Sequence, residues 1–262
     1  MTGSSSARRT LASAATPLAF GIAFVLLWEF VVRWRGIKQY ILPKPSAIWH
    51  EAVSNFGFLR SAAAVSGLNA LVGLICGVLL GCLVAMIASR FKLLAEIVTP
   101  LSAAISAIPI VVIVSILNNM FRIGSEVPRR LMVTIVVFFV VFINVARGLR
   151  ESNATQMELL RSYAASESQV MKKVRLPNAM PFLFIAIKIA APLSVTTAFV
   201  SEYFGGTQDG LGQKIPAAMA NSKDPLGWAY VGAACVVGLT FFIAANVVEY
   251  VAVPWQRTRV SR

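Results

Sequence analysis

The chain alternates long apolar runs with shorter polar segments. A membrane-spanning helix needs about 20 consecutive, mainly apolar residues. Six runs approach this length: Pro17–Trp34, Leu68–Ser89, Ile97–Leu117, Leu131–Ala146, Met180–Val200 and Gly227–Val253. Pro100 and Pro109 interrupt the third run. The pattern predicts an all-α integral membrane protein with six transmembrane helices.

The segments between the runs predict connections rather than further domains. Residues 35–66 contain a proline-rich turn and then an amphipathic stretch, which predicts a short helix with Ser46 as its N-cap. Residues 203–226 are rich in Gly, Pro, Asn and Asp, which predicts an irregular loop with a short helix near Ile215–Ala220. No segment is long enough to fold as a nucleotide-binding or substrate-binding domain. We therefore expect residues 1–262 to form a single transmembrane domain.

Composition and charge support a place in the lipid bilayer. Hydrophobic residues make up 57% of the chain, charged residues only 13%, and the mean hydropathy is +0.73, whereas soluble domains carry about 25% charged residues. The net charge is +13, but Lys and Arg mostly flank the apolar runs, so we do not expect nucleic-acid binding. Their modest excess on one side predicts that both termini are cytosolic, with residues 1–16 as a short tail.

Motifs that carry chemistry are scarce in this chain. The three cysteines have no metal-ligand spacing, and His50 is the only histidine. The phosphate-binding motif G-x-x-x-x-G-K-[ST] does not occur. We therefore expect no metal, no cofactor and no catalytic residue in this chain.

Some residues inside the runs are unusual for a bilayer. The second run has a ridge of small residues typical of close helix packing: Gly73, Gly77 and Gly81. Lys188 lies in an apolar run, where an ionisable side chain faces a pathway, extends to the membrane interface or bonds to a neighbouring helix. Glu202 either lines the outer exit of a pathway or caps a helix end in water. Pro109 and Pro192 are expected to kink their helices. The candidate pathway or gate residues are Lys188, Glu202, Pro109 and Pro192.

The connection between the fourth and fifth runs, about residues 147–178, has the most informative pattern. It is long for a connection between helices and carries many charges. Residues 156–161 favour a helix, and the small residues Ala164, Ala165 and Ser166 then predict a corner. We expect the corner to project into the cytosol.

A second helix is expected after the corner. It runs from Glu167 to Val174, with Ser166 as its N-cap, and ends at Leu176-Pro177. One side of this helix is apolar and is formed by Val170, Met171 and Val174. Basic residues surround that side: Lys172, Lys173 and Arg175. A helix–corner–helix of this kind fits a groove on a partner protein.

This connection resembles the loop "E-A-A, three residues, G, nine or more residues, I-x-L-P" of inner-membrane components of binding-protein-dependent ABC importers. Glu158, Ala164 and Leu176-Pro177 stand at matching positions. Leu159 and Leu160 replace the usual alanines, and Ala164 replaces the usual glycine. Because alanine disfavours a positive φ, we expect Ala164 to form the corner with a negative φ. In the family this loop sits in a cleft of the ATPase subunit. The implied ATPase-coupling residues are Glu158, Leu159, Leu160, Ala164, Ala165, Leu176 and Pro177.

Further motifs extend the resemblance over nearly the whole chain. Ile41–Ser46, Phe121–Gly124, Ser201–Gly206 and Gly210–Gly212 resemble the "LPSPS", "WFGIG", "AExxG" and "GLG" motifs of one branch. That branch takes up nitrate, sulfonates, taurine and bicarbonate, and includes permeases for riboflavin and for thiamine-precursor pyrimidines. Lys188 falls where the branch often has a basic residue.

The resemblance implies a type I ABC importer permease fold in the cytoplasmic (inner) membrane. Two copies would pair as a homodimer, and a separate ATP-binding cassette subunit would bind ATP and Mg. An external binding protein would deliver the substrate. This substrate would be a small anion, such as a sulfonate, taurine or nitrate, or a vitamin-like ring, such as riboflavin or a thiamine-precursor pyrimidine.

Two other functions remain open from the residues alone. A secondary transporter driven by an ion gradient predicts an internal repeat and acidic residues deep in the spans. No repeat is visible, and the acidic residues cluster at the ends of the runs. A membrane scaffold that transports nothing has no need of the patterned connection.

Overall fold

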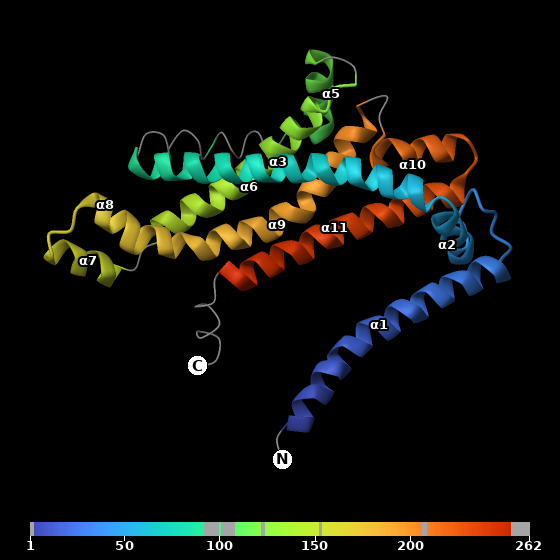
Figure 1. Ribbon diagram of the computed structural model, residues 1–262, viewed down its shortest axis with the longest axis horizontal. Coiled ribbons are helices and arrows are strands. Elements are labelled where there is room, and N and C mark those ends of the chain that lie inside the picture. The colour runs from blue at the N-terminus through green and yellow to red at the C-terminus, as the bar shows by residue number, and fades with distance from the viewer. Residues whose placement is uncertain are drawn as a thin grey trace. The chain divides into compact units, whose positions relative to one another are not determined.

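The computed structural model of this protein describes residues 3–91, 100, 108–121, 124–151, 154–205 and 209–252. All regular elements within these ranges are helical, which confirms the all-α prediction (Figure 1). They are α1 (Gly3–Trp34), α2 (Pro45–Ser54), α3 (Phe56–Arg90), α5 (Ile110–Met120), α6 (Val127–Arg150), α7 (Ala154–Ser162), α8 (Glu167–Val170), the π-helical turn η1 (Met171–Arg175), α9 (Leu176–Tyr203), α10 (Leu211–Ala220) and α11 (Asp224–Ala252). Two compact units are present: Met1–Leu59 with Ile215–Gly232, and Arg60–Lys214 with Ala233–Arg262.

Four helical segments in the described ranges are long and apolar enough to cross a membrane. They are Phe56–Arg90, Val127–Arg150, Glu167–Tyr203 and Asp224–Ala252, and α5 is a shorter apolar helix. The predicted first span lies within α1. The predicted third span, Ile97–Leu117, falls outside the described residues except for Pro100 and the part from Ile108 onward.

Several helix ends differ from the predicted ones. α3 begins at Phe56 rather than near Leu68, and α6 continues to Arg150, inside the predicted connection. α10 begins at Leu211 rather than near Ile215. An apolar run marks only the part of a helix suited to hydrocarbon, whereas the backbone hydrogen bonds continue into polar residues on either side.

Ser46 does not cap α2, contrary to the prediction. Lys44 takes the N-cap position, and Pro45 begins the helix, where its missing N–H leaves no hydrogen bond unmade. Ser46 instead donates to the Glu29 carboxylate, from its backbone N at 3.0 Å and from its Oγ at 2.9 Å. The same carboxylate pairs with Arg33 Nη2 at 2.6 Å. One acidic side chain therefore joins the end of α1 to the start of α2.

The glycine ridge of α3 packs against a ridge of valines on α6. A Cβ built on each glycine would lie 2.4, 2.6 and 2.9 Å from the Cβ of the facing valine. The pairs are Gly73 with Val133, Gly77 with Val137, and Gly81 with Val141. Real side chains do not approach so closely, so only glycine permits this helix separation. The predicted packing role is confirmed, and the partner is α6 of the same chain.

Helices α6 and α9 form the centre of the larger unit, where they lie side by side (Figure 1). The buried core residues of these two helices are mostly valine and alanine. Small side chains on α9, such as Ala186 and Ala190, bring its backbone close to its neighbours. This pair carries the residues of the candidate sites described below.

The two candidate kink prolines take different places. Pro109 has an extended backbone, with φ of −57° and ψ of 127°, directly before α5. It therefore precedes a helix instead of kinking one, which corrects the prediction for this residue. Pro192 lies inside α9. Because proline has no N–H, the carbonyl of Lys188, one turn earlier, loses its usual helical donor.

Candidate functional site

The connection from α6 to α9 is a hairpin of two short helices, α7 and α8, which we call the α7–α8 hairpin (residues 154–170). Figure 1 shows it at one end of the α6–α9 pair. The predicted helix, corner and second helix are all present in this order. The hairpin therefore gathers the predicted coupling residues from Glu158 to Ala165 in one projection.

The corner of the hairpin is a left-handed residue. Ala164 has φ of +49°, so the expectation of a negative φ was wrong. This conformation allows the backbone N of Ala165 to donate to the carbonyl O of Leu160 at 3.0 Å. The bond closes α7 with the arrangement in which helices commonly end, and glycine is the usual residue at its left-handed position. The local hydrogen bond outweighs the conformational preference of alanine.

We expect Ala164→Gly to stabilise the corner. A left-handed conformation costs a non-glycine residue about 1–2 kcal/mol, while the greater freedom of glycine in the unfolded chain offsets about 0.4–1 kcal/mol. Hydrogen exchange at the amide of Ala165 should therefore slow by up to about 15-fold. The matched control is Ala165→Gly, which should speed exchange because Ala165 has no positive φ. Faster exchange in Ala164→Gly would show that the left-handed conformation of Ala164 is not strained.

The second helix of the hairpin begins with Ser166 as its N-cap, as predicted, and Gln169 makes this cap reciprocal. The backbone N of Gln169 donates to Ser166 Oγ at 3.3 Å, and the backbone N of Ser166 donates to Gln169 Oε1 at 2.8 Å. Glu167 stands in the first turn, beside the positive end of the helix. These contacts fix the direction in which α8 leaves the corner.

The second helix does not end at Leu176-Pro177, which corrects the prediction. Helices α8 and α9 join through η1 into one helical segment, Glu167–Tyr203. In η1 the backbone N of Leu176 donates to the carbonyl O of Met171, five residues earlier. Pro177 follows at the start of α9, where its missing N–H is tolerated. The hairpin is therefore continuous with a membrane-spanning helix.

The base of the hairpin is closed by a close crossing of α6 and α9. A Cβ on Gly148 would lie 2.7 Å from the ring of Phe182 and 2.9 Å from Ala179 Cα. Asn178 Nδ2 donates to the carbonyl O of Gly148 at 2.9 Å and to that of Glu151. The sequence analysis missed Asn178, although an Asn directly after Leu-Pro at a helix start was a usable signal. This crossing anchors the hairpin to the transmembrane pair.

The exposed apolar face of the hairpin lies on α7 and the corner. Leu159 and Tyr163 are 56% and 75% exposed, and Glu158 is also exposed. The apolar side predicted for the second helix is instead turned inward. Val170 is buried, and Met171 packs against the hydrophobic core. The exposed apolar side chains are therefore on α7 and the corner, while the exposed residues of α8 are polar: Glu167, Ser168 and Gln169.

A second group of polar side chains gathers at the opposite end of the α6–α9 pair. We call it the second polar cluster, and its members come from α3, α9 and the start of α6: Ser66, Asn69, Glu126, Arg129, Arg130 and Glu202. Asn69 Nδ2 donates to Glu126 Oε2 at 2.6 Å, and Arg130 Nε donates to Asn69 Oδ1 at 3.0 Å. Arg129 also pairs with Glu126, and its side chain is 1% exposed. The sequence analysis missed this cluster, because its fourth apolar run begins only at Leu131.

Glu202 is fully buried, so neither of its two predicted positions is observed. Its Oε2 accepts from Ser66 Oγ at 2.6 Å and from the backbone N of Gly212 at 3.1 Å. Ser66 Oγ in turn accepts from the backbone N of Leu211 at 2.8 Å. The carboxylate thus binds the first turn of α10 and the side of α3 together.

Lys188 forms an ion pair across two helices. Its Nζ lies 2.8 Å from Glu249 Oε2 on α11, and both side chains are mostly buried. This is the interhelix arrangement weighed in the sequence analysis. Lys188 thus lies one helical turn before Pro192 on α9 and is paired with α11.

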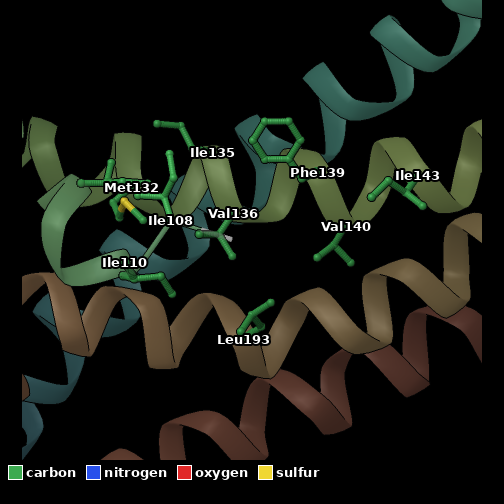
Figure 2. Close-up of a pocket in the computed structure, with 10 residues that line it drawn as sticks. Ile108, Ile110, Met132, Ile135, Val136, Phe139, Val140, Ile143 and Leu193 are labelled. Atoms are coloured by element: carbon green, nitrogen blue, oxygen red, sulfur yellow. The ribbon is translucent and has the colours of Figure 1, made fainter. Parts of the chain in front are cut away.

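A cavity of about 280 Å³ lies between α5, α6 and α9 (Figure 2). Its lining side chains are all apolar: Ile108, Ile110, Ile113, Met132, Ile135, Val136, Phe139, Val140, Ile143 and Leu193. Pro109 and Pro192 are chain neighbours of lining residues, so these two candidates stand beside the cavity. Such a chamber accommodates an apolar surface and offers little to a charge.

Comparison with known proteins adds a family match to this geometry. Residues 77–261 match the family described as "Binding-protein-dependent transport system inner membrane component". The chain is 25% identical over 245 residues to the formylaminopyrimidine transport permease protein ThiX of Halalkalibacterium halodurans, with 92% of this chain and 96% of that protein covered. It is 24% identical over 236 residues to the riboflavin transport system permease protein RibX of Chloroflexus aurantiacus, with 88% and 87% covered.

The fold also matches a solved structure. A crystal structure of an amino acid ABC transporter with histidines has a TM-score of 0.64 to this chain, at 15% sequence identity. The match covers 76% of this chain and 95% of that one. At this identity the likeness concerns the fold alone.

Proposed function

Because the chain belongs to the family of binding-protein-dependent transport system inner membrane components, we propose that it is the permease subunit of an ATP-driven importer. It moves a small solute, delivered by a separate binding protein, across the cytoplasmic membrane. The α7–α8 hairpin is the contact to the ATPase. The single observation that carries this assignment is the exposed face of α7 on a hairpin that continues into a membrane-spanning helix.

The family assignment settles the broad class of protein. Members are multi-pass subunits of the inner membrane with no catalytic role, and an ATPase subunit and a substrate-binding protein are separate partners. The fold is that of a type I ABC importer permease, as expected. The match to ThiX and RibX confirms the predicted branch.

The proposed mechanism uses the continuity from the hairpin to α9. Two copies of the chain pair around a central path, and both termini lie in the cytosol. When the ATPase subunits bind ATP and close, they draw the two hairpins together. Because α8, η1 and α9 form one helical segment, displacement of the hairpin moves α9 with it. ATP thus shifts the spans between inward-open and outward-open states, and this chain needs no reactive group.

The apolar cavity bears on the substrate. A small anion entering it would lose its hydration without gaining a charged or hydrogen-bonding side chain from the described lining. A ring compound would lose little favourable hydration on entering the cavity, because the faces of its ring are apolar. Of the two substrate classes left open by the sequence, the cavity supports a vitamin-like ring such as a thiamine-precursor pyrimidine. The transport named for ThiX is consistent with this choice.

Uptake into proteoliposomes tests both parts of the proposal. The chain is reconstituted with its ATPase subunit and its binding protein, ATP is enclosed, and labelled formylaminopyrimidine or taurine is offered outside. We expect pyrimidine uptake that requires ATP and persists with a proton uncoupler. Uptake driven by a proton gradient without ATP would favour a secondary transporter, whereas no uptake of either solute together with no stimulation of the ATPase would favour a scaffold. ATP-dependent uptake of taurine alone would overturn only the substrate choice.

A further inference from the structure

The buried carboxylate of Glu202 holds two other elements to the outer end of α9. Both of its hydrogen bonds arrive at one oxygen, Oε2, from Ser66 Oγ at 2.6 Å and from the backbone N of Gly212 at 3.1 Å. Gln213 adds a third tie, since its Nε2 donates to the carbonyl O of Glu202 at 2.9 Å. In the described part of the chain, Glu202 Oε1 has no hydrogen-bond partner.

Two glycines allow this close contact. A Cβ on Gly210 would lie 2.3 Å from the carboxyl group of Glu202, and a Cβ on Gly212 would lie 2.3 Å from the carbonyl O of Phe199. No side chain fits at either position without displacing the first turn of α10. The Gly-Leu-Gly sequence therefore has a physical reason, which is the contact between this turn and the end of α9.

The carboxyl group of Glu202 is buried beside the start of α10. The first N–H groups of α10 point at the carboxylate side, so the positive end of that helix faces Glu202. Two donors to one oxygen replace part of the hydration that the group loses. The arrangement is fully buried, with Glu202 at 0% exposure and Ser66 at 1%.

We propose that Glu202 is the positioning residue of an outer clamp, which makes α3 and the first turn of α10 move together with α9. The proposal rests on the proposed function, because α9 is displaced only if the α7–α8 hairpin is moved by an ATPase. Glu202 and the hairpin occupy the two ends of one helical segment, Glu167–Tyr203. The clamp thus carries a displacement made on the cytosolic side to the outer face. Glu202 acts through its neighbours and does not touch the solute.

Two replacements of similar size separate the clamp from a charge effect. Glu202→Leu removes both hydrogen bonds. Glu202→Gln keeps both, since its amide oxygen takes the place of Oε2 and its NH₂ group takes the place of Oε1. Thr196→Val is the matched control, because Thr196 is an exposed residue of α9 whose hydroxyl, among the residues that the structure describes, bonds only to the carbonyl O of Pro192 on its own helix.

The measurements use the complete complex in proteoliposomes. Solute uptake per ATP hydrolysed reports coupling, and hydrogen exchange over residues 209–214 reports whether the amides of Leu211 and Gly212 stay bonded. We expect Glu202→Leu to speed this exchange and to lower uptake per ATP, each by tenfold or more, because it removes both hydrogen bonds that Oε2 accepts from Ser66 and Gly212. For Glu202→Gln, both the exchange rate and the uptake per ATP should stay within about fivefold of the wild-type values. Thr196→Val should have the wild-type values of both.

Three outcomes overturn the proposal. Faster exchange in Glu202→Leu with unchanged uptake per ATP means that coupling does not require the contact of Glu202 with α3 and α10. Equal defects in Glu202→Gln and Glu202→Leu mean that charge, not position, is required. A wild-type complex with no ATP-dependent uptake rejects the proposed function, and the clamp as a transmitter falls with it. If Glu202→Leu does not fold, Ser66→Ala, which removes the hydroxyl shared by Glu202 and Leu211, must show the same two changes.

Discussion

Replacing Gly77 with leucine is expected to prevent α3 and α6 from packing, so that little folded protein is recovered from membranes. A Cβ at this position would already lie 2.6 Å from Val137 Cβ and 2.9 Å from the carbonyl O of Thr134. One of these neighbours is backbone, so the helices themselves must separate, and the neighbouring glycine–valine contacts are lost with them. We expect a loss of roughly 3 kcal/mol or more in stability. Thermal unfolding in detergent, followed by size-exclusion chromatography, measures it.

The control for this experiment is another glycine inside a long apolar helix. Gly238 lies on α11, and a Cβ built there meets nothing within 4 Å. Gly238→Leu adds the same side chain without the clash and should give a wild-type yield and melting temperature. A Gly77→Leu protein with wild-type stability would show that α3 and α6 do not pack through this ridge.

A charge reversal at Glu158 is the second large effect that we expect. Glu158 is exposed on α7, next to the exposed Leu159, so Glu158→Lys leaves the core of the fold unchanged. If the α7–α8 hairpin docks in the ATPase, the reversal places a wrong charge in that contact. Losses of about 2–5 kcal/mol are typical when one partner of such a contact is removed, which corresponds to a decrease of roughly 30-fold or more in coupled uptake.

Uptake, ATPase stimulation and co-purification with the ATPase subunit are measured together for this variant. Gln156→Lys is the matched control, because Gln156 is exposed on the same helix but is displaced from Glu158 by about 200° around its axis. We expect this control to keep uptake and ATPase stimulation. Normal transport by Glu158→Lys would remove the hairpin from the proposed mechanism.

The sequence predicted the type of the helices better than their ends and partners. Apolar runs indicate hydrocarbon contact, so α6, α9 and α11 were found, but such runs do not show where backbone hydrogen bonding stops. Glycine spacing on α3 indicated close packing, and the facing valines of α6 became visible only in three dimensions. Pro177 was taken as a helix end, because a π-helical turn that absorbs a proline has no sequence pattern of its own.

For the candidate sites too, local features were predicted and contacts between distant residues were not. The order of helix, corner and second helix was predicted from local signals, including the Ser166 cap. The left-handed conformation of Ala164 was not predicted, because a hydrogen bond from the backbone N of Ala165 to the carbonyl O of Leu160 overrides the preference of alanine for a negative φ. Burial of Glu202 depends on Ser66, which is 136 residues away in the chain. Local pattern carries no information about such a contact.

The π-helical turn η1 has a consequence for the direction of the hairpin. Each residue turns an α-helix by about 100°, and a π turn holds about one residue more than an α turn. The segment before Met171 is therefore out of phase with α9 by about that angle. A one-residue deletion between Met171 and Arg175 would restore a regular helix, and the exposed face of α7 would swing about a quarter of a turn around the α9 axis. The rotational setting of the whole hairpin thus depends on a single surplus residue.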